Sequence, residues 1–176
     1  MAAAWFEGGA GADGRRDAVG ALLRRESGSE MTVPTEKDWG DYHSDLDQEY
    51  AHRLFAGHTN EEMQPHFRAN VLERTSELRF MPEIPFRYYM IGFRDFVMAG
   101  DFEYEGADAA SCFLRLVLEK LEQEPACIAP IMSVLLETVE HVARNQSAFD
   151  ADLDIYGNFL DLFARIRALD AARSGA

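Results

Sequence analysis

The chain has 176 residues and a net charge of −14, from 17 basic and 31 acidic residues. Its hydrophobic content of 47% is too high for a disordered protein, and its two cysteines are too few for a disulfide-stabilised scaffold. The negative charge disfavours binding to a bare phosphate backbone, and the length is that of one domain.

The first 30 residues are dominated by glycine and alanine, which fill 13 of the 30 positions. A segment with so few core-forming side chains cannot offset the entropy lost on ordering. We therefore expect residues 1–35 to form a flexible tail. Residues 36–176 contain no second linker, which predicts a single helical domain there.

Two helices are expected in the first third of this domain. The first begins at the capping sequence 44–47 and ends at Gly57. Its expected apolar face is formed by Leu46, Tyr50, Leu54 and Phe55. Thr59 followed by Glu62 matches a capping box and predicts a second helix as far as Phe67.

The next two helices are separated by prolines. Asn70 can cap a third helix, because its side chain can accept from a free backbone N–H. The apolar residues of that helix are Val71, Leu72, Leu78 and Phe80. Pro82 and Pro85 predict a break at residues 81–84, and Pro85 fits the first position of a fourth helix that ends at Gly100.

The fourth helix is apolar on nearly all sides, so we expect it to lie in the centre of the fold. Gly92 in its middle costs about 1 kcal/mol of helix propensity, and a close helix crossing would explain that cost. Arg87 and Arg94 are seven residues apart, and their guanidinium groups must reach solvent or pair with acids.

Three more helices complete the prediction. The fifth runs from Asp108 to Glu124, and the sixth covers residues 127–144, with Pro130 placed in its first turn. The seventh starts at one of the aspartates Asp150, Asp152 and Asp154. Its apolar face is Ile155, Phe159, Leu162, Phe163, Ile166 and Leu169. The sequence thus predicts an all-α, single-domain bundle of about six or seven helices.

Two patterns resemble metal sites without matching them. Asp150, Asp152, Asp154 and Asp161 occupy positions one, three, five and twelve of a calcium loop, but the glycine and glutamate that such a loop needs are missing. Glu49 and His52 have the spacing of a di-iron ligand pair, and the other nearby match is Glu137 with His141. We read these residues as a helix N-terminus and surface polar groups, and expect no metal.

Catalytic signatures are not evident. The five histidines and the serines Ser44, Ser76, Ser111 and Ser133 stand in no motif that would expose a nucleophile. Cys112 and Cys127 fit no zinc or redox spacing, so we expect buried, reduced thiols and a cytoplasmic location. We nominate no catalytic residue and no cofactor, which leans against an enzyme without excluding one.

Charge is distributed unevenly. Residues 36–62 carry a net charge of −6 and residues 95–140 a net charge of −8, while residues 64–94 carry +2. Aromatic residues between acids, as in the connection 101–106, suit an interface anchor with a charged rim, although Phe102 and Tyr104 could instead fold back onto the core. The candidate partner-binding residues are Asp101, Phe102, Glu103, Tyr104, Glu105, Asp108, Asp45, Asp47 and Glu49.

Three functions are compatible with this pattern. The first is a soluble, non-enzymatic protein that binds and neutralises or regulates a basic partner protein, as an immunity protein or antitoxin does. The second is a metal-dependent enzyme that uses the Asp, Glu and His clusters. The third is a homo-oligomeric structural protein. We expect no nucleic-acid or membrane partner, because the longest uncharged apolar run, residues 127–136, is half the length of a membrane span.

Overall fold

The computed structural model describes residues 31–102 and 104–175, and all regular structure within these ranges is helical. The elements are α2 (Glu36–Trp39), η1 (Tyr42–Ser44), α3 (Leu46–Phe55), α4 (Asn60–Ala69), α5 (Val71–Phe80), α6 (Glu83–Ala99), α7 (Gly106–Gln123), α8 (Pro125–Ile128), η2 (Ala129–Ile131), α9 (Met132–Arg144), η3 (Gln146–Phe149), α10 (Leu153–Tyr156) and α11 (Phe159–Ser174). Val33–Ala176 form one compact unit. The all-α bundle is confirmed, whereas residues 1–30 of the expected flexible tail 1–35 lie outside the described residues.

Side-chain caps begin the helices where the sequence predicts them. The Asp45 side chain accepts hydrogen bonds from two backbone N–H groups in the first turn of α3. Thr59 and Glu62 form a capping box at the start of α4, and the Asn70 side chain accepts from the Glu73 N–H at the start of α5. Each cap satisfies a donor that the first turn leaves free.

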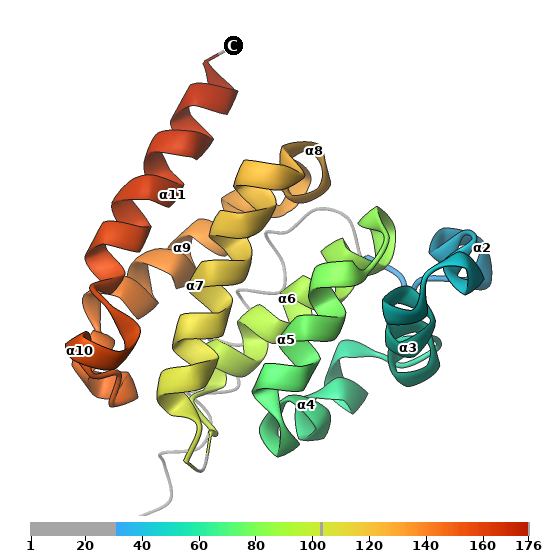
Figure 1. Ribbon diagram of the computed structural model, residues 1–176, viewed down its shortest axis with the longest axis horizontal. Helices are drawn as coiled ribbons and strands as arrows, with labels where there is room; N and C mark the ends of the chain where they lie inside the picture. Colours follow the sequence, from blue (N-terminus) through green and yellow to red (C-terminus); the bar gives the residue numbers. More distant parts are fainter. Residues whose placement is uncertain (1–30, 103, 176) are drawn as a thin grey trace, which may run out of the picture. The chain divides into compact units, whose positions relative to one another are not determined.

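Helix α6 lies behind α5 and α7 and contacts α2, α4, α5, α7, α8 and α9 (Figure 1). Its central position follows from its apolar surface. A Cβ atom at Gly92 would lie 2.7 Å from Cγ of Asn60, so the crossing with α4 requires glycine. Asn60 Nδ2 donates to the Tyr88 carbonyl and Gln64 Nε2 to the Gly92 carbonyl, each at 3.0 Å. The predicted close approach at Gly92 is confirmed.

The arginines of α6 pair with carboxylates, and one of them also donates to a backbone carbonyl group. Arg87 pairs with Glu83, and its Nε donates to the Cys127 carbonyl at 2.7 Å. Arg94 pairs with the neighbouring Asp95. Both arginines therefore hold their charge at the edge of the core, as burial of a guanidinium group requires.

Several predicted helix boundaries are wrong, and three of the differences have a local cause. Helix α6 begins at Glu83, so Pro85 lies third in its first turn, where the missing N–H still costs no hydrogen bond. The predicted helix over 127–144 is divided by η2, because α8 starts at Pro125 and Pro130 falls beyond its first turn. The seventh helix is divided into α10 and α11 at Gly157, whose φ of 76° ends α10.

The stretch Pro125–Arg144 is also a candidate for a membrane-spanning helix. This stretch is long and apolar enough to cross a membrane by length and composition, but half of its most apolar window is buried inside the bundle. The core helix of a bundle has the same composition, so the stretch is weak evidence for a span.

Helix α7 lies between α5 and α11, and α3 packs against α5 on the side away from α7 (Figure 1). The apolar faces predicted for the outer helices are wrong in part. Phe55, Val71, Leu78, Phe159 and Ile166 are buried, whereas Leu46, Tyr50, Leu72, Phe80 and Ile155 are exposed. Thus α3 and α5 turn some large apolar side chains outward, and this surface defines the candidate site.

Candidate functional site

The connection predicted to bind a partner is largely occupied by contacts within the protein. Asp101 pairs with Arg68 of α4, whose Nε also donates to the Asp101 carbonyl at 3.2 Å. Phe102 packs against the rings of Phe96 and Phe149. Phe102 thus folds back onto the core, whereas Tyr104 is 97% exposed and its role at an interface stays a prediction.

Glu105 and Asp108 also make contacts that hold the bundle together. Glu105 Oε2 accepts from the Val71 N–H at 3.2 Å, at the first residue of α5. Asp108 Oδ1 accepts from the Tyr156 hydroxyl at 3.0 Å. Glu103 lies outside the described residues. This connection leaves the Tyr104 ring exposed, whereas the described carboxylates Asp101, Glu105 and Asp108 already have partners.

The acidic residues Asp45, Asp47 and Glu49 lie elsewhere, at the start of α3. Asp45 caps the helix, and Glu49 is exposed. Asp47 faces Phe80 at the end of α5, whereas Glu105 contacts the beginning of that helix. The structure therefore places the two predicted acidic groups at opposite ends of α5 and not on one surface.

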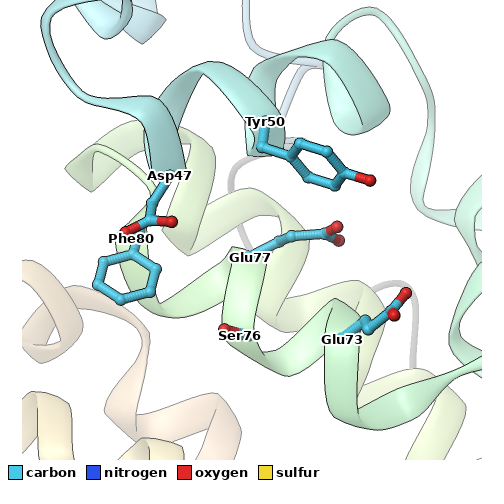
Figure 2. A pocket seen from close by; sticks show the side chains of 6 residues that line it. All are labelled: Asp47, Tyr50, Glu73, Ser76, Glu77 and Phe80. Carbon is cyan, nitrogen blue, oxygen red and sulfur yellow. The ribbon is translucent and has the colours of Figure 1, made fainter.

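A hollow of about 250 Å³ lies between α3 and α5. It is lined by Asp47, Tyr50, Glu73, Ser76, Glu77 and Phe80. Figure 2 shows Asp47 and Tyr50 of α3 facing Phe80 and Glu77 of α5, with Glu73 further along the same face. We call this hollow the α3–α5 groove. Its lining holds three carboxylates, two aromatic rings and one serine hydroxyl.

Glu77 is the least accessible of these carboxylates, with 7% of its surface exposed. Its Oε1 accepts from Arg74 Nη2 at 3.0 Å, and its Oε2 lies 2.8 Å from Arg74 Nε without the alignment of a hydrogen bond. Burial raises the pKa of the Glu77 carboxyl to about 7, against the attraction of Arg74 and with the repulsion of Glu73. The Glu77 carboxylate is therefore only partly ionised at neutral pH.

Arg74 is shared between two carboxylates. Its Nη2 lies 3.0 Å from Glu73 Oε2 as well as from Glu77 Oε1. Asp47 adds a third carboxylate, and no basic residue is among those that line the groove. The positive charge beside the groove is thus smaller than the negative charge that its lining can carry.

Aromatic side chains form the outer part of the groove. Tyr50 and Phe80 are both exposed, and Leu46, one turn before Tyr50, is 82% exposed. The guanidinium carbon of Arg53 lies 4.5 Å from the centre of the Tyr50 ring. Exposed aromatic rings with carboxylates around them are typical of the centre of a protein–protein interface and its charged rim.

Sequence reasoning named Asp47 but missed the rest of the groove as a site. Tyr50 and Phe80 were assigned to buried faces, and residues 64–94 counted as mildly basic. The signal that could have shown it is Glu73 and Glu77, four residues apart on one helix. Like charges at this spacing destabilise a helix, so two glutamates there suggest a role in binding.

The geometry gives little support to the two metal-site patterns seen in the sequence. Within residues 31–102 and 104–175, no three His, Cys, Asp or Glu side chains lie close enough together to hold a metal ion. His52 does not join Glu49; its Nε2 lies 3.0 Å from Glu36 Oε2. Its ring stacks on Tyr42, with ring centres 3.6 Å apart. Sequence analysis did not predict α2 and η1, which supply these partners.

The other residues considered for metal binding or catalysis, the aspartates near residue 150 and the two cysteines, lie where they contribute to the fold. Asp152 caps α10, and Asp150 adopts a left-handed conformation with φ 55°. Both cysteines are free thiols, with Cys127 buried and Cys112 half-buried. Burial raises the pKa of both thiols, which lowers the fraction of reactive thiolate. Neither thiol has the setting of a nucleophile.

Comparison with protein-family models, with curated proteins and with solved structures finds no match for this chain.

Proposed function

We propose that this protein binds a basic partner protein through the α3–α5 groove and has no catalytic activity of its own. The single observation that carries the proposal is the lining of the groove: three carboxylates beside two exposed aromatic rings, with no basic residue among them. A cationic side chain would gain charge pairing and ring contact in the same place.

The charge of the whole chain supports the same partner chemistry. At −14, the protein attracts cationic surfaces and repels phosphate-rich ones. Electrostatic complementarity of this kind raises the rate of association and selects the partner. An immunity or antitoxin role follows as the finer form of the proposal. In that role the acidic groove would cover a cationic surface that the partner uses for nucleic acid.

The test compares two variants that each lose three carboxyl groups. The groove variant carries Asp47→Asn, Glu73→Gln and Glu77→Gln. The control carries Glu137→Gln, Asp154→Asn and Asp161→Asn, which are exposed residues of α9, α10 and α11. Circular dichroism and urea unfolding establish that both are folded.

Each protein is then used to capture partners from lysate of the source cell at low and at physiological salt. The proposal expects one stoichiometric basic protein with the wild type and the control, and its loss with the groove variant. Capture of the same protein by all three chains would exclude the groove as the binding site.

One observation favours self-association as a second candidate. Leu153, Ile155 and Leu160, at the junction of α10 and α11, are exposed together with nothing apolar covering them in the described residues. Exposed apolar side chains in close sequence can bury one another between copies. Light scattering that gives twice the monomer mass for the wild type and the monomer mass for Ile155→Ser would support it, and a monomeric wild type would remove it.

A further inference from the structure

We propose that two copies of this chain pair through the outer face of α11, with the two helices antiparallel across a two-fold axis. This inference rests on the self-association put forward above as a second candidate and does not depend on the α3–α5 groove. It adds which helix makes the contact, in which direction the helices run and which charges meet.

Helix α11 is apolar on all sides but is covered on only one. It packs against α7 and α9, and Phe159 and Ile166 are its buried residues. Leu160, Ala164 and Ala168, spaced four residues apart, are exposed on the opposite side. A helix that is apolar all round is normally buried, as α6 is in this fold. Figure 1 shows α11 instead at one edge of the bundle, so its outer face is free for a further contact among the described residues.

The distribution of side-chain size along this face favours antiparallel helices. The large apolar side chains lie at its beginning, because Leu153 and Ile155 of α10 are 62% and 74% exposed and Leu160 is 49% exposed. Further along α11 the face is formed by alanines, including Ala164 and Ala168. If the two helices run in opposite directions, the large side chains of each copy cover the alanines of the other and the contact is filled.

The charge of α11 favours a second copy as the occupant of this face. The chain carries a net charge of −14, so two copies repel each other over most of their surfaces. Helix α11 has two aspartates against three arginines, a net charge of +1. Two copies can therefore approach here without that repulsion, whereas a basic partner would be drawn to the acidic surfaces.

Asp161 and Arg165 make the face complementary to itself. They are one turn apart on the same flank of the outer face, and both are exposed. Asp161 takes part in none of the ion pairs of the described residues. The Arg165 side chain contacts Glu122 but is still 64% exposed. An antiparallel copy places Asp161 of each helix opposite Arg165 of the other, so the same ion pair forms twice.

Sedimentation equilibrium of the full chain, from micromolar to millimolar concentration, measures the self-association. We expect a reversible equilibrium between the 19.8 kDa monomer and a dimer. Leu160→Gln removes a leucine from both copies at once and should weaken the dimer about tenfold or more. The matched control is Leu72→Gln, because Leu72 is also the second residue of its helix and is 54% exposed. This control should leave the dissociation constant unchanged, and circular dichroism establishes that both variants are folded.

Two charge reversals test the direction of the helices. Asp161→Arg and Arg165→Asp each bring like charges together at two symmetric places, so each variant alone should dimerise about tenfold more weakly or worse. An equal mixture of the two variants should form a heterodimer, because the two arginines of one chain then face the two aspartates of the other.

A wild type that stays monomeric at every concentration would overturn both the inference and the second candidate, and would leave this face to another partner. A dimer that none of the α11 variants weakens would overturn the contact through α11 and leave self-association standing through another surface. Charge variants that mixing does not rescue would overturn the antiparallel arrangement. Partner binding at the groove is tested separately, since α3 lies at the edge of the bundle opposite α11 (Figure 1).

Discussion

The Glu77 carboxylate, which lines the α3–α5 groove, forms an ion pair with the Arg74 guanidinium group beside it, with Oε2 and Nε 2.8 Å apart. Both side chains are largely withdrawn from water, so the pair has a desolvation cost that its attraction does not fully offset. The raised pKa of Glu77 expresses this balance.

Removing the Glu77 charge should change how stability depends on pH. The folded protein binds the Glu77 proton more tightly than the unfolded chain does, because its pKa is raised from 4.5 to about 7. The free energy of unfolding therefore falls as pH rises through this window, by about 1–3 kcal/mol.

In Glu77→Gln this contribution is absent. Relative to the wild type, we expect the variant to be more stable at pH 8 than at pH 5. Urea unfolding of both proteins at the two pH values measures the difference. Parallel pH profiles for the two proteins would contradict the buried, destabilised carboxylate.

Gly92→Ala should destabilise the protein by about 1–3 kcal/mol, the usual cost of overpacking. The added methyl group would lie 2.7 Å from Cγ of Asn60 and displace the amide that donates to the Tyr88 carbonyl. The double variant Asn60→Ala with Gly92→Ala should recover part of the loss compared with the sum of the two single changes. Simple additivity in urea unfolding would show that the two side chains do not compete for this space.

Gln146 holds the α10 segment with its side-chain amide. Nε2 donates to the Ala151 and Gly157 carbonyls at 3.0 and 2.8 Å, and Oε1 accepts from the Phe159 N–H at 2.9 Å. Gln146→Leu leaves these groups without partners and should cost about 1–3 kcal/mol.

The amide of Phe159 reports this loss locally. Its hydrogen exchange should accelerate in Gln146→Leu and stay unchanged in Gln123→Leu, an exposed position at the end of α7. Protection equal to that of the wild type in both variants would show that the amide network is not what orders α10.

Lys120 is a buried cation, and we expect its methylene chain to contribute more to stability than its charge. It is 1% exposed, its Nζ donates to Glu124 Oε1 at 2.7 Å, and it lies 5.0 Å from the centre of the Phe86 ring. Lys120→Met preserves the packing and should change stability by less than about 1.5 kcal/mol, because Glu124 is 52% exposed and water can solvate its carboxylate when the lysine is lost.

Lys120→Ala removes the packed chain and should cost about 2 kcal/mol or more. Thermal unfolding of the two variants gives the comparison. A methionine variant as unstable as the alanine variant would show that the charge itself, and not the packing, stabilises this position.

Most of the fold could be predicted because local signals determine the helix starts. Asp45, Thr59 and Asn70 cap helices where their side chains suggest, and the close crossing at Gly92 follows from its cost within an apolar helix. The prolines show the limit of such signals. Pro130 is compatible with a first turn, but whether it lies there depends on where the preceding helix begins.

The groove could not be predicted because it depends on which side of a helix faces its neighbour. Tyr50 and Phe80 fit an apolar pattern and yet lie at the surface between α3 and α5. Asp101 and Glu105 look like free acids in the sequence, but Arg68 and the Val71 N–H, more than 30 residues away, are their partners. Long-range contacts of this kind leave no local pattern.

The most direct test of the groove is the affinity of a capped hexa-arginine peptide for the groove variant and for the control variant, each of which lacks three carboxyl groups. Long-range attraction changes equally in both, so any difference reports the site itself. The account predicts that Asp47→Asn, Glu73→Gln and Glu77→Gln together reduce the affinity by about tenfold or more relative to the control, the effect of losing one charge-assisted contact. Equal loss in the two variants would mean that the peptide responds to net charge alone, and would contradict a binding site between α3 and α5.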